Sequence, residues 1–297
     1  MNSENSTREQ QPFSLKTPRR IAAYFAASLL NKKDRLLALT LCRMIGDRPR
    51  CFVNTIPKAG THLIERCMAL LPGMRPAGYH LRPGSGRDVS NSLRFLASIG
   101  HGCFVTAHLP FSGERLSLLE QMGYRHVLLI RDPRDIAVSL VFFPARAPMT
   151  RRFAKDTEKR RFFRQLPTFD ERLTAAISGV PSIGLDGIGA KLSSFLPWAE
   201  HGSLLVRFED LVGEQGGGTR DRQIRTISRI AAHLGIGLSE SQASSIGSRI
   251  YSRRAGTFRK GEIGDWRNHF SDRHKSLFKE AAGKALIELG YESSMDW

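Results

Sequence analysis

The chain has 297 residues and 41% apolar content, enough to bury the core of one large α/β domain or two small ones. Lysine and arginine number 45 against 28 acids, and the formal charge of +17 favours an anionic partner such as a nucleotide, a nucleic acid, an acidic glycan or a membrane surface. Cys42, Cys51, Cys67 and Cys103 lack metal-ligand spacing and a dense pattern, which excludes a cysteine scaffold and predicts buried free thiols in a reducing compartment.

The N-terminal part is basic. We expect residues 1–15 to be disordered and residues 20–46 to form one or two basic amphipathic helices. The first twenty residues are polar and do not resemble a signal peptide, and the apolar run 21–30 is too short to span a bilayer. These features predict a cytoplasmic protein without a transmembrane anchor.

Strands and helices alternate along the rest of the chain. Short, almost wholly apolar strands are expected at 51–54, 102–110, 124–135 and 202–210. Helices are expected from the first turn to about residue 71, at 112–122, after residue 135, at 186–200, and, beyond a flexible loop at 213–221, at 221–235 and 238–248. Apolar strands alternating with helices predict an α/β fold, a single domain with a central parallel sheet flanked by helices.

Polar side chains follow three of these strands. Lys58, Gly60 and Thr61 follow the first strand, His108 follows the second, and Arg131 follows the third. Because ligands of parallel sheets bind at the carboxyl ends of the strands, these residues are expected to meet at one edge. That edge is suited to hold an anionic nucleotide and to move one group from it.

The segment "PKAGTHL" (57–63) predicts a P-loop-like phosphate-binding turn. Gly60 lets the backbone approach a ligand, the N–H groups of the following helix point at an anion, and Lys58 adds a positive charge. The alternative is an ordinary strand-to-helix turn with a solvated lysine.

Two further segments carry candidate anion ligands. In "LLIRDPRDIAVSL", Asp132 is a plausible helix cap and Pro133 the first helical residue, with Arg131 before them and Ser139 inside the helix. In "TFRKGEIGDWRNHF" (257–270), two cations and a glycine suit a loop that closes over a phosphate. A surface arginine, a self-bonded helix serine and a surface turn are the alternatives.

Four segments, in order, resemble the sulfotransferases that use 3′-phosphoadenosine-5′-phosphosulfate (PAPS). "TIPKAGT" is similar to their 5′-phosphosulfate loop, "AHLP" to the stretch with the catalytic histidine, "RDPRDIAVS" to the 3′-phosphate segment and "RKGEIGDWRNHF" to the C-terminal nucleotide loop. The resemblance runs from about residue 48 to 270. It implies a basic N-terminal segment over 1–47 and a cytosolic-type sulfotransferase domain over 48–297.

The resemblance also implies roles for individual residues. The 5′-phosphosulfate would be held by Lys58, Ala59, Gly60, Thr61 and His62, and the 3′-phosphate by Arg131, Ser139, Arg259, Lys260 and Gly261. His108 would be the general base, and Lys58 would stabilise the leaving phosphate. The product would be adenosine 3′,5′-bisphosphate (PAP). No metal is implied, and the sequence has no evident metal-ligand cluster.

Some positions depart from the family pattern. Leu63 replaces a tryptophan that stacks on adenine, Thr106 replaces a lysine two residues before the histidine, and Phe208 replaces a tyrosine. The family's dimerisation pattern is not evident after the last nucleotide loop. These differences argue against a simple transfer of the small-phenol acceptor class to this chain.

The acceptor is suggested only by charge. Residues 146–164 hold eight bases and two acids, and residues 16–50 hold nine bases and two acids. We expect a hydroxyl-bearing acceptor, such as a glycolipid or an acidic saccharide, with contact to a membrane surface and no nucleic acid. Solvated basic faces are the alternative to acceptor docking. A P-loop-type kinase and a non-catalytic polyanion-binding protein are the alternative functions.

Overall fold

The computed structural model describes residues 48–83, 95–146, 157–252 and 259–297. The predicted disorder of 1–15, the predicted helices of 20–46 and Cys42 lie outside the described residues. Most of the basic stretch at 16–50 and residues 147–156 of the stretch at 146–164 also lie outside them.

A sheet of five parallel strands forms the centre of the fold. The strand order is β2 (Arg75–Leu81), β3 (Cys103–Ala107), β1 (Arg50–Thr55), β4 (Tyr124–Ile130) and β7 (Leu204–Arg207). In the central strand Val53 lies opposite Thr106 on one side and Val127 on the other. Its side chains from Cys51 to Thr55 are all buried, as expected for a strand covered on both faces. The predicted α/β class is therefore confirmed.

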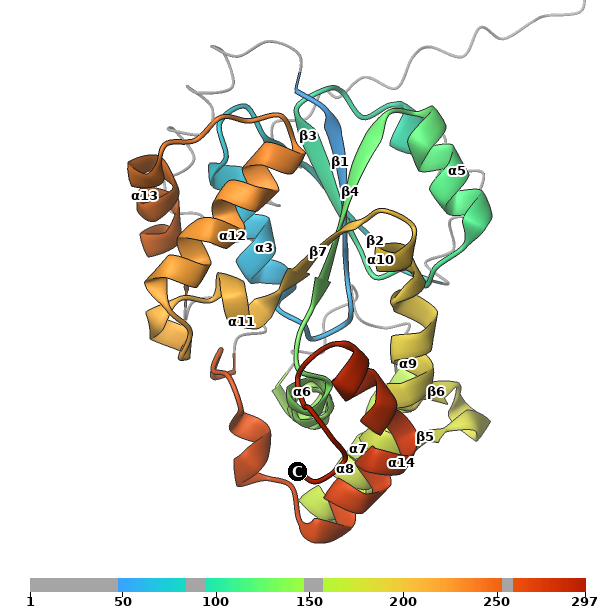
Figure 1. The fold of residues 1–297 in the computed structure, drawn as a ribbon. Helices are drawn as coiled ribbons and strands as arrows, with labels where there is room; N and C mark the ends of the chain where they lie inside the picture. The colour runs from blue at the N-terminus through green and yellow to red at the C-terminus, as the bar shows by residue number, and fades with distance from the viewer. Residues whose placement is uncertain (1–47, 84–94, 147–156, 253–258) are drawn as a thin grey trace, which may run out of the picture.

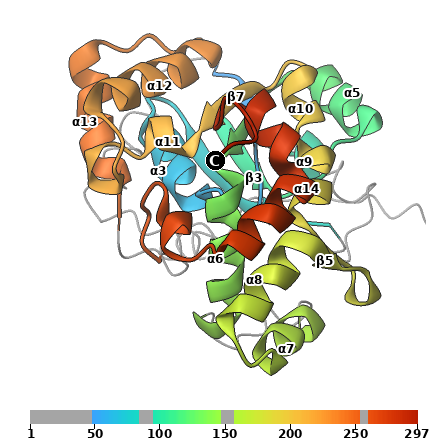
Figure 2. The same ribbon diagram turned by 60° about the horizontal axis from the view of Figure 1, so that its bottom comes forward.

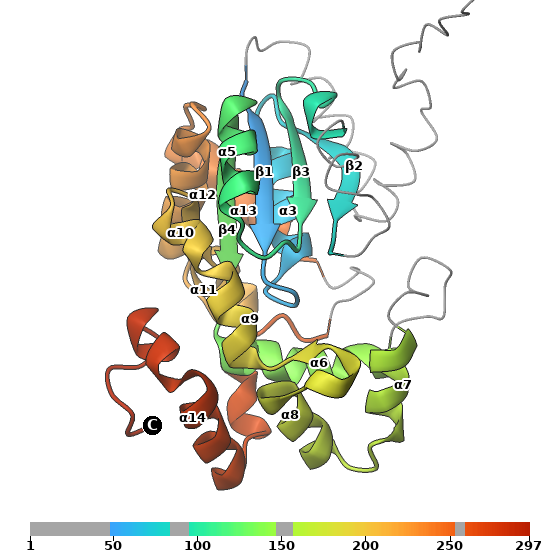
Figure 3. The same ribbon diagram turned by 90° about the vertical axis from the view of Figure 1, so that its right-hand side faces the viewer.

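Helices cover both faces of this sheet (Figures 1 and 3). The helices α3 (Thr61–Leu70), α12 (Arg220–His233) and α13 (Glu240–Ile250) lie on one face, and α5 (Gly113–Gln121) and α10 (Pro197–Glu200) on the other. The short helix α11 (Phe208–Leu211) follows β7 directly. Within the described ranges, no helix is long and apolar enough to cross a bilayer.

A second group of helices lies beyond the carboxyl ends of the strands (Figures 1 and 2). It comprises α6 (Pro133–Arg146), α7 (Thr157–Gln165), α8 (Phe169–Ser178), α9 (Ile188–Phe195) and α14 (Asp272–Glu288). A small hairpin of β5 (Gly179–Val180) and β6 (Leu185–Asp186) surrounds the 3₁₀ turn η2 (Pro181–Ile183), and two further 3₁₀ turns are η3 (Glu214–Gly216) and η4 (Asp265–Asn268). Helix α14 packs against α8 and α9. The carboxyl ends of the strands therefore face this second group of helices (Figures 1 and 2).

Most boundaries agree with the sequence pattern, and the differences have local causes. Helix α6 begins at Pro133, as the cap pattern predicted, and Asp132 Oδ1 accepts the Arg134 N–H at 2.9 Å. The third strand, expected to reach residue 135, therefore ends at Ile130. The last strand, expected to reach residue 210, ends at Arg207 because α11 begins at Phe208. The edge strand β2, the hairpin of β5 and β6, and the helices α7, α8 and α14 were not predicted.

The cysteines of the described part are free thiols. Cys51 and Cys67 are buried and Cys103 is partly buried. Burial raises the pKa of the Cys67 thiol to about 12 and raises the pKa of Cys51 further still. Both thiols are therefore protonated core groups at neutral pH.

Candidate active site

The turn from β1 into α3 has an unusual backbone. Lys58 has a left-handed φ of 76°, Gly60 has a φ of 110°, and the Ala59 N–H donates to Ile56 O at 2.9 Å. A Cβ built on Gly60 would lie 2.6 Å from Cδ2 of Phe208, so a side chain there meets both backbone strain and a clash. Glycine is required at this position for the close approach of Phe208.

The start of α3 is open for an anion. The first N–H groups of a helix have no partner within the helix, and no side chain caps α3 at Gly60. The first turn of α3 contains no acidic residue. This helix start therefore has the polarity that favours a phosphate or sulfate group.

Positive charge converges on Lys58 from four other elements. Burial, and after it the charges of nearby arginines, together lower the pKa of Lys58 to about 7. The contributing arginines are, in order of effect, Arg131 after β4, Arg259 of the C-terminal loop, Arg82 after β2, and Arg160 on α7. These cations repel one another, and an anion bound among them would offset that repulsion.

Arg131 is a buried guanidinium at the end of β4. Its Nη2 donates to Asp135 Oδ2 at 3.2 Å and to the Glu262 carbonyl at 2.6 Å, and its guanidinium carbon lies 4.4 Å from the centre of the Phe208 ring. The side chain is 6% exposed, yet its buried Nε has no hydrogen-bond partner in the part of the chain that the structure describes. A buried N–H donor of this kind suits an anionic ligand.

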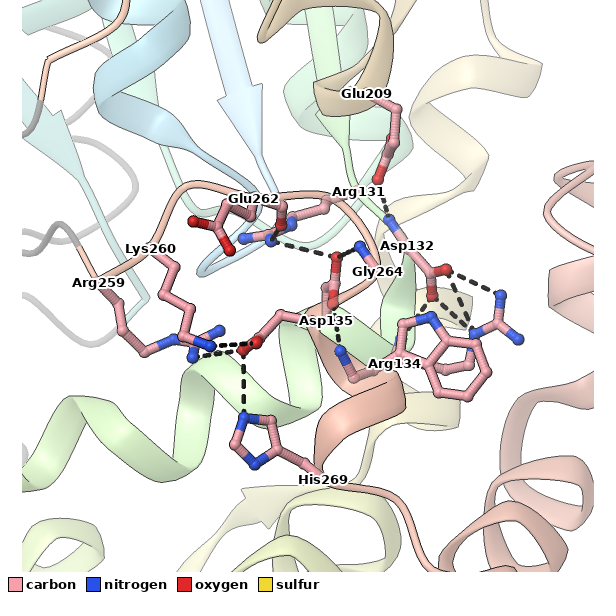
Figure 4. A network of polar contacts seen from close by, with 12 residues as sticks. Arg131, Asp132, Arg134, Asp135, Glu209, Arg259, Lys260, Glu262, Gly264 and His269 are labelled. Atoms are coloured by element: carbon pink, nitrogen blue, oxygen red, sulfur yellow. Dashed lines mark hydrogen bonds and ion pairs between the residues drawn. The ribbon is translucent and has the colours of Figure 1, made fainter. Parts of the chain in front are cut away.

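Asp135 fastens the C-terminal loop to α6 (Figure 4). It is fully buried, and its carboxylate accepts the backbone N–H groups of Gly264 and Trp266, each at 2.9 Å. Burial raises the pKa of Asp135 above its usual value. The same carboxylate bonds Arg131, so α6, the arginine and the loop form one connected unit.

The two cations of the C-terminal loop, Arg259 and Lys260, meet a second buried carboxylate, that of Asp265. Lys260 Nζ lies 2.7 Å from Oδ1, Arg259 Nη1 lies 2.5 Å from Oδ2, and His269 Nε2 lies 3.2 Å from Oδ2. Burial alone would raise the pKa of Asp265, but the bonds from Lys260 and Arg259 outweigh it and hold the pKa well below its usual range. Part of the positive charge of this loop is therefore balanced within the protein.

The remaining predicted ligands of this region are placed by the same elements. Ser139 is buried on α6, and Gly261 lies between the two cations and Glu262 with a φ of 67°. The Lys260 carbonyl accepts a hydrogen bond from the Tyr251 hydroxyl at 3.0 Å.

His108 lies at the end of β3 beside the start of α3. Its Nδ1 donates to the Thr55 carbonyl at 2.8 Å and lies 3.0 Å from the Thr55 hydroxyl, which contacts the Thr61 hydroxyl at 2.8 Å. Because a carbonyl only accepts, Nδ1 carries the hydrogen and Nε2 carries the lone pair. Burial lowers the pKa of His108 to about 4. The imidazole is thus neutral at pH 7, with Nε2 able to accept a proton.

The loop after His108 is held from both sides. Asn54 Nδ2 donates to the Leu109 carbonyl at 2.7 Å, and the Leu109 N–H donates to Asn54 Oδ1 at 3.0 Å. The indole N–H of buried Trp198 donates to the same carbonyl at 3.0 Å. These bonds fix the backbone that carries the histidine.

Several residues of this region were not predicted as site residues from the sequence, although Thr106 was noted as a departure from the family pattern and Arg160 lies in the basic stretch 146–164. Arg82, Arg160, Asp135 and Asp265 belong to the cation cluster or balance its charge, and Glu65, His80 and Thr106 form a polar line next to His108. Glu65 also lies 2.9 Å from Nδ1 of His62, the residue expected to complete the phosphosulfate loop. The sequence did contain a signal for the three carboxylates. Glu65 and Asp135 lie in largely apolar helices, and Asp265 follows the two cations of the C-terminal loop. The described residues contain no group of three or more His, Cys, Asp or Glu side chains that could hold a metal ion.

No protein-family model matches the sequence, and no curated protein matches it. Solved structures do match the fold. Mouse sulfotransferase SULT7A1 complexed with PAP is 21% identical, with a TM-score of 0.57 over 85% of this chain and 93% of that one. Retinol dehydratase with androsterone and the inactive cofactor PAP is 19% identical, with a TM-score of 0.52 over 85% of each chain. Retinol dehydratase with retinol and PAP is 18% identical, with a TM-score of 0.52 over 86% of each chain. The predicted sulfotransferase fold is confirmed.

Proposed function

We propose that this protein is a PAPS-dependent sulfotransferase that transfers a sulfuryl group to a hydroxyl or an amine of its acceptor. The observation that carries the proposal is the link between His108 and the helix start. The base candidate contacts Thr55, and Thr55 contacts Thr61, the first residue of α3. A proton acceptor therefore stands beside an anion-binding turn, as group transfer to a hydroxyl requires.

The residues present fit a nucleotide with two anionic ends. For the 5′-phosphosulfate we propose Lys58, Ala59, Gly60, Thr61 and His62, and for the 3′-phosphate Arg131, Ser139, Arg259, Lys260 and Gly261. The uncapped start of α3 and the buried, unpartnered Nε of Arg131 support this fit. The titles of the similar solved structures name PAP as their ligand, in line with the same proposal.

The chain's own groups have distinct roles in the proposed reaction. When bound, PAPS supplies an activated sulfuryl group. Nε2 of His108 accepts the proton of the acceptor hydroxyl, and Thr55 holds the opposite nitrogen so that Nε2 stays unprotonated until then. Lys58, with its neighbouring arginines, stabilises the negative charge that grows on the leaving phosphate.

For the acceptor we propose a hydroxyl-bearing molecule with an acidic group, such as an acidic saccharide or a glycolipid at a membrane surface in the cytoplasm. Arg160, on α7 of the basic stretch, is 5% exposed and adds its charge to the Lys58 cluster. Arg82 adds a cation from the end of β2. Both lie outside the motifs that resemble nucleotide-binding segments, which favours a role toward the acceptor.

The test combines binding with single turnover. A thermal shift with PAP and none with ATP and Mg²⁺ is expected, followed by sulfation of members of a panel of phenols, sterols, sugars and glycolipids incubated with labelled PAPS. His108→Ala should lower kcat by about 10²–10⁴-fold with unchanged PAP affinity, because the histidine faces the acceptor. The exposed His201 offers a matched control, His201→Ala. Stabilisation by ATP and Mg²⁺ without PAP binding would refute the proposal.

A further inference from the structure

Glu65 is a buried carboxylate beside the site that the proposed reaction does not use. It lies on α3 and is 6% exposed. Its Oε1 accepts a hydrogen bond from the Thr106 hydroxyl at 3.0 Å, and its Oε2 lies 2.9 Å from Nδ1 of His62. A buried carboxylate costs free energy unless it is bonded, so its position next to β3 calls for a function.

The contacts of Thr106 determine the state of a second histidine, His80. Thr106 Oγ1 lies 2.9 Å from His80 Nδ1 on the neighbouring strand β2. The hydroxyl has one hydrogen and donates it to Glu65, so toward His80 it accepts, and His80 Nδ1 carries a hydrogen. The line Glu65–Thr106–His80 therefore fixes both the tautomer and the orientation of this ring.

His80 lies directly against His108. The ring centres are 4.3 Å apart, and the ring planes meet at 76°, an edge-to-face contact. Both rings have the same tautomer, His80 through the Thr106 hydroxyl and His108 through the Thr55 carbonyl. Thr106 occupies the position at which the PAPS-dependent sulfotransferases that this sequence resembles have a lysine. Here the hydrogen bonds from Thr106 to Glu65 and His80 stand where that family has a positive charge.

We propose that Glu65, acting through Thr106 and His80, is a positioning residue for His108, an inference that rests on the proposed role of His108 as the base. The line holds the His80 ring, which packs edge-to-face against the His108 ring and keeps its Nε2 toward the acceptor. When the acceptor O–H bond breaks, the proton binds Nε2, the electron pair stays on the acceptor oxygen, and the new imidazolium faces a buried negative charge.

The charges around His108 make that carboxylate important. Lys58, after β1, and Arg82, after β2, disfavour a positive imidazolium, and Glu65 on α3 favours one. His80 adds a second imidazole from β2. Among the described side chains whose charge affects the pKa of His108, those that remain without Glu65 are cationic.

Two nearly isosteric variants separate charge from hydrogen bonding. Glu65→Gln removes the charge but can still accept from Thr106. It should move the acidic limb of the kcat/KM profile for the acceptor to lower pH and lower the plateau rate about three- to tenfold, since a weaker base abstracts a proton more slowly. Thr106→Val keeps the charge but cuts the line, and should lower the plateau rate while the limb stays in place. Glu280→Gln, at an exposed carboxylate on α14, is the control.

Nitrogen-15 NMR of the histidine rings tests the same inference without turnover. At neutral pH the parent protein should have His80 and His108 as Nδ1–H tautomers. In Thr106→Val, His80 should change to a mixture while His108, held by Thr55, should not. An Nε2–H tautomer for His80 in the parent, or a parent-like pH profile in Glu65→Gln, would overturn the inference. A parent protein without sulfation activity would instead refute the proposed function. In that case the His80 tautomer would still show whether the line Glu65–Thr106–His80 orients the His80 ring.

Discussion

Lys58 should take up a proton when PAP binds. The pKa of Lys58 is about 7 in the ligand-free protein, because its ammonium group is buried and faces arginines. An anion at this site reverses the local charge balance, and an opposite charge within a few ångströms raises a lysine pKa by about 1–3 units. Above pH 7, binding should therefore convert a largely neutral amine into an ammonium group.

The size of the uptake follows from the pKa. At pH 8, one unit above a pKa of about 7, roughly a tenth of the Lys58 side chains carry a proton. If binding raises the pKa to about 8–10, then about half to almost all of them do. We expect PAP binding at pH 8 to absorb about 0.4–0.9 proton, and less at pH 6, where the free lysine is already charged.

Calorimetry in buffers of different ionisation enthalpy measures this number directly. Phosphate buffers compete for the site and are avoided. Lys58→Arg, whose guanidinium is always charged, should bind PAP with little uptake, and Lys58→Met should bind more weakly, also with little uptake. If the parent's binding enthalpy is independent of the buffer at pH 8, or if Lys58→Met retains the full uptake, the reasoning is refuted.

The same pKa has a consequence for stability. Because it is below the usual value of 10.5, the unfolded chain binds more protons between about pH 7 and 10.5, and stability rises with pH across that window. Below pH 7 the charged lysine is fully unfavourable. Lys58→Met should therefore raise the Tm of the ligand-free protein most at pH 6, with a gain that fades toward pH 10.

Two further variants test the proposed 3′-phosphate site and the loop attached to it. Arg131→Ala should weaken PAP binding about ten- to a hundredfold, since a charge-assisted hydrogen bond contributes about 1.5–3 kcal/mol, and calorimetry with parent-like affinity would contradict the assignment. Asp135→Asn leaves one of the two loop N–H groups facing an amide N–H, and should cost about 1–3 kcal/mol of unfolding free energy and weaken PAP binding. Asp186→Asn, at an exposed carboxylate, is the control in denaturant titration, and equal stability of both variants would argue against the loop attachment.

The sequence predicted those parts of the fold that are coded locally. The apolar strands β1, β3 and β4 and the start of α6 at Pro133 follow from short patterns. Strand β2 was missed because Pro76 and Gly78 interrupt its pattern, and its register shifts between Pro76 and His80. An edge strand tolerates both residues, since only one side of it is paired.

Because β2 was not predicted, two residues of the candidate site were not predicted either. His80 lies on β2 and Arg82 follows it, so neither was expected beside His108. Asp135 was not singled out for a different reason: its partners Gly264 and Trp266 are about 130 residues further along the chain. Short patterns carry no information about such distant contacts, whereas the order of motifs after each strand did anticipate that Lys58 and Arg131 lie close together.

The hydrogen bond from Gly264 to Asp135 can form only after both residues have been synthesised. The two residues are 129 positions apart, so at about 5–20 residues per second the ribosome makes Gly264 about 6–26 s after Asp135. During that interval β1, β3 and β4 are already available to pair, but the carboxylate at the start of α6 has no N–H partners from the loop. A nascent chain can therefore pair β1, β3 and β4 before the loop that contains Gly264 has been made, and folding factors have a defined interval in which to act on it.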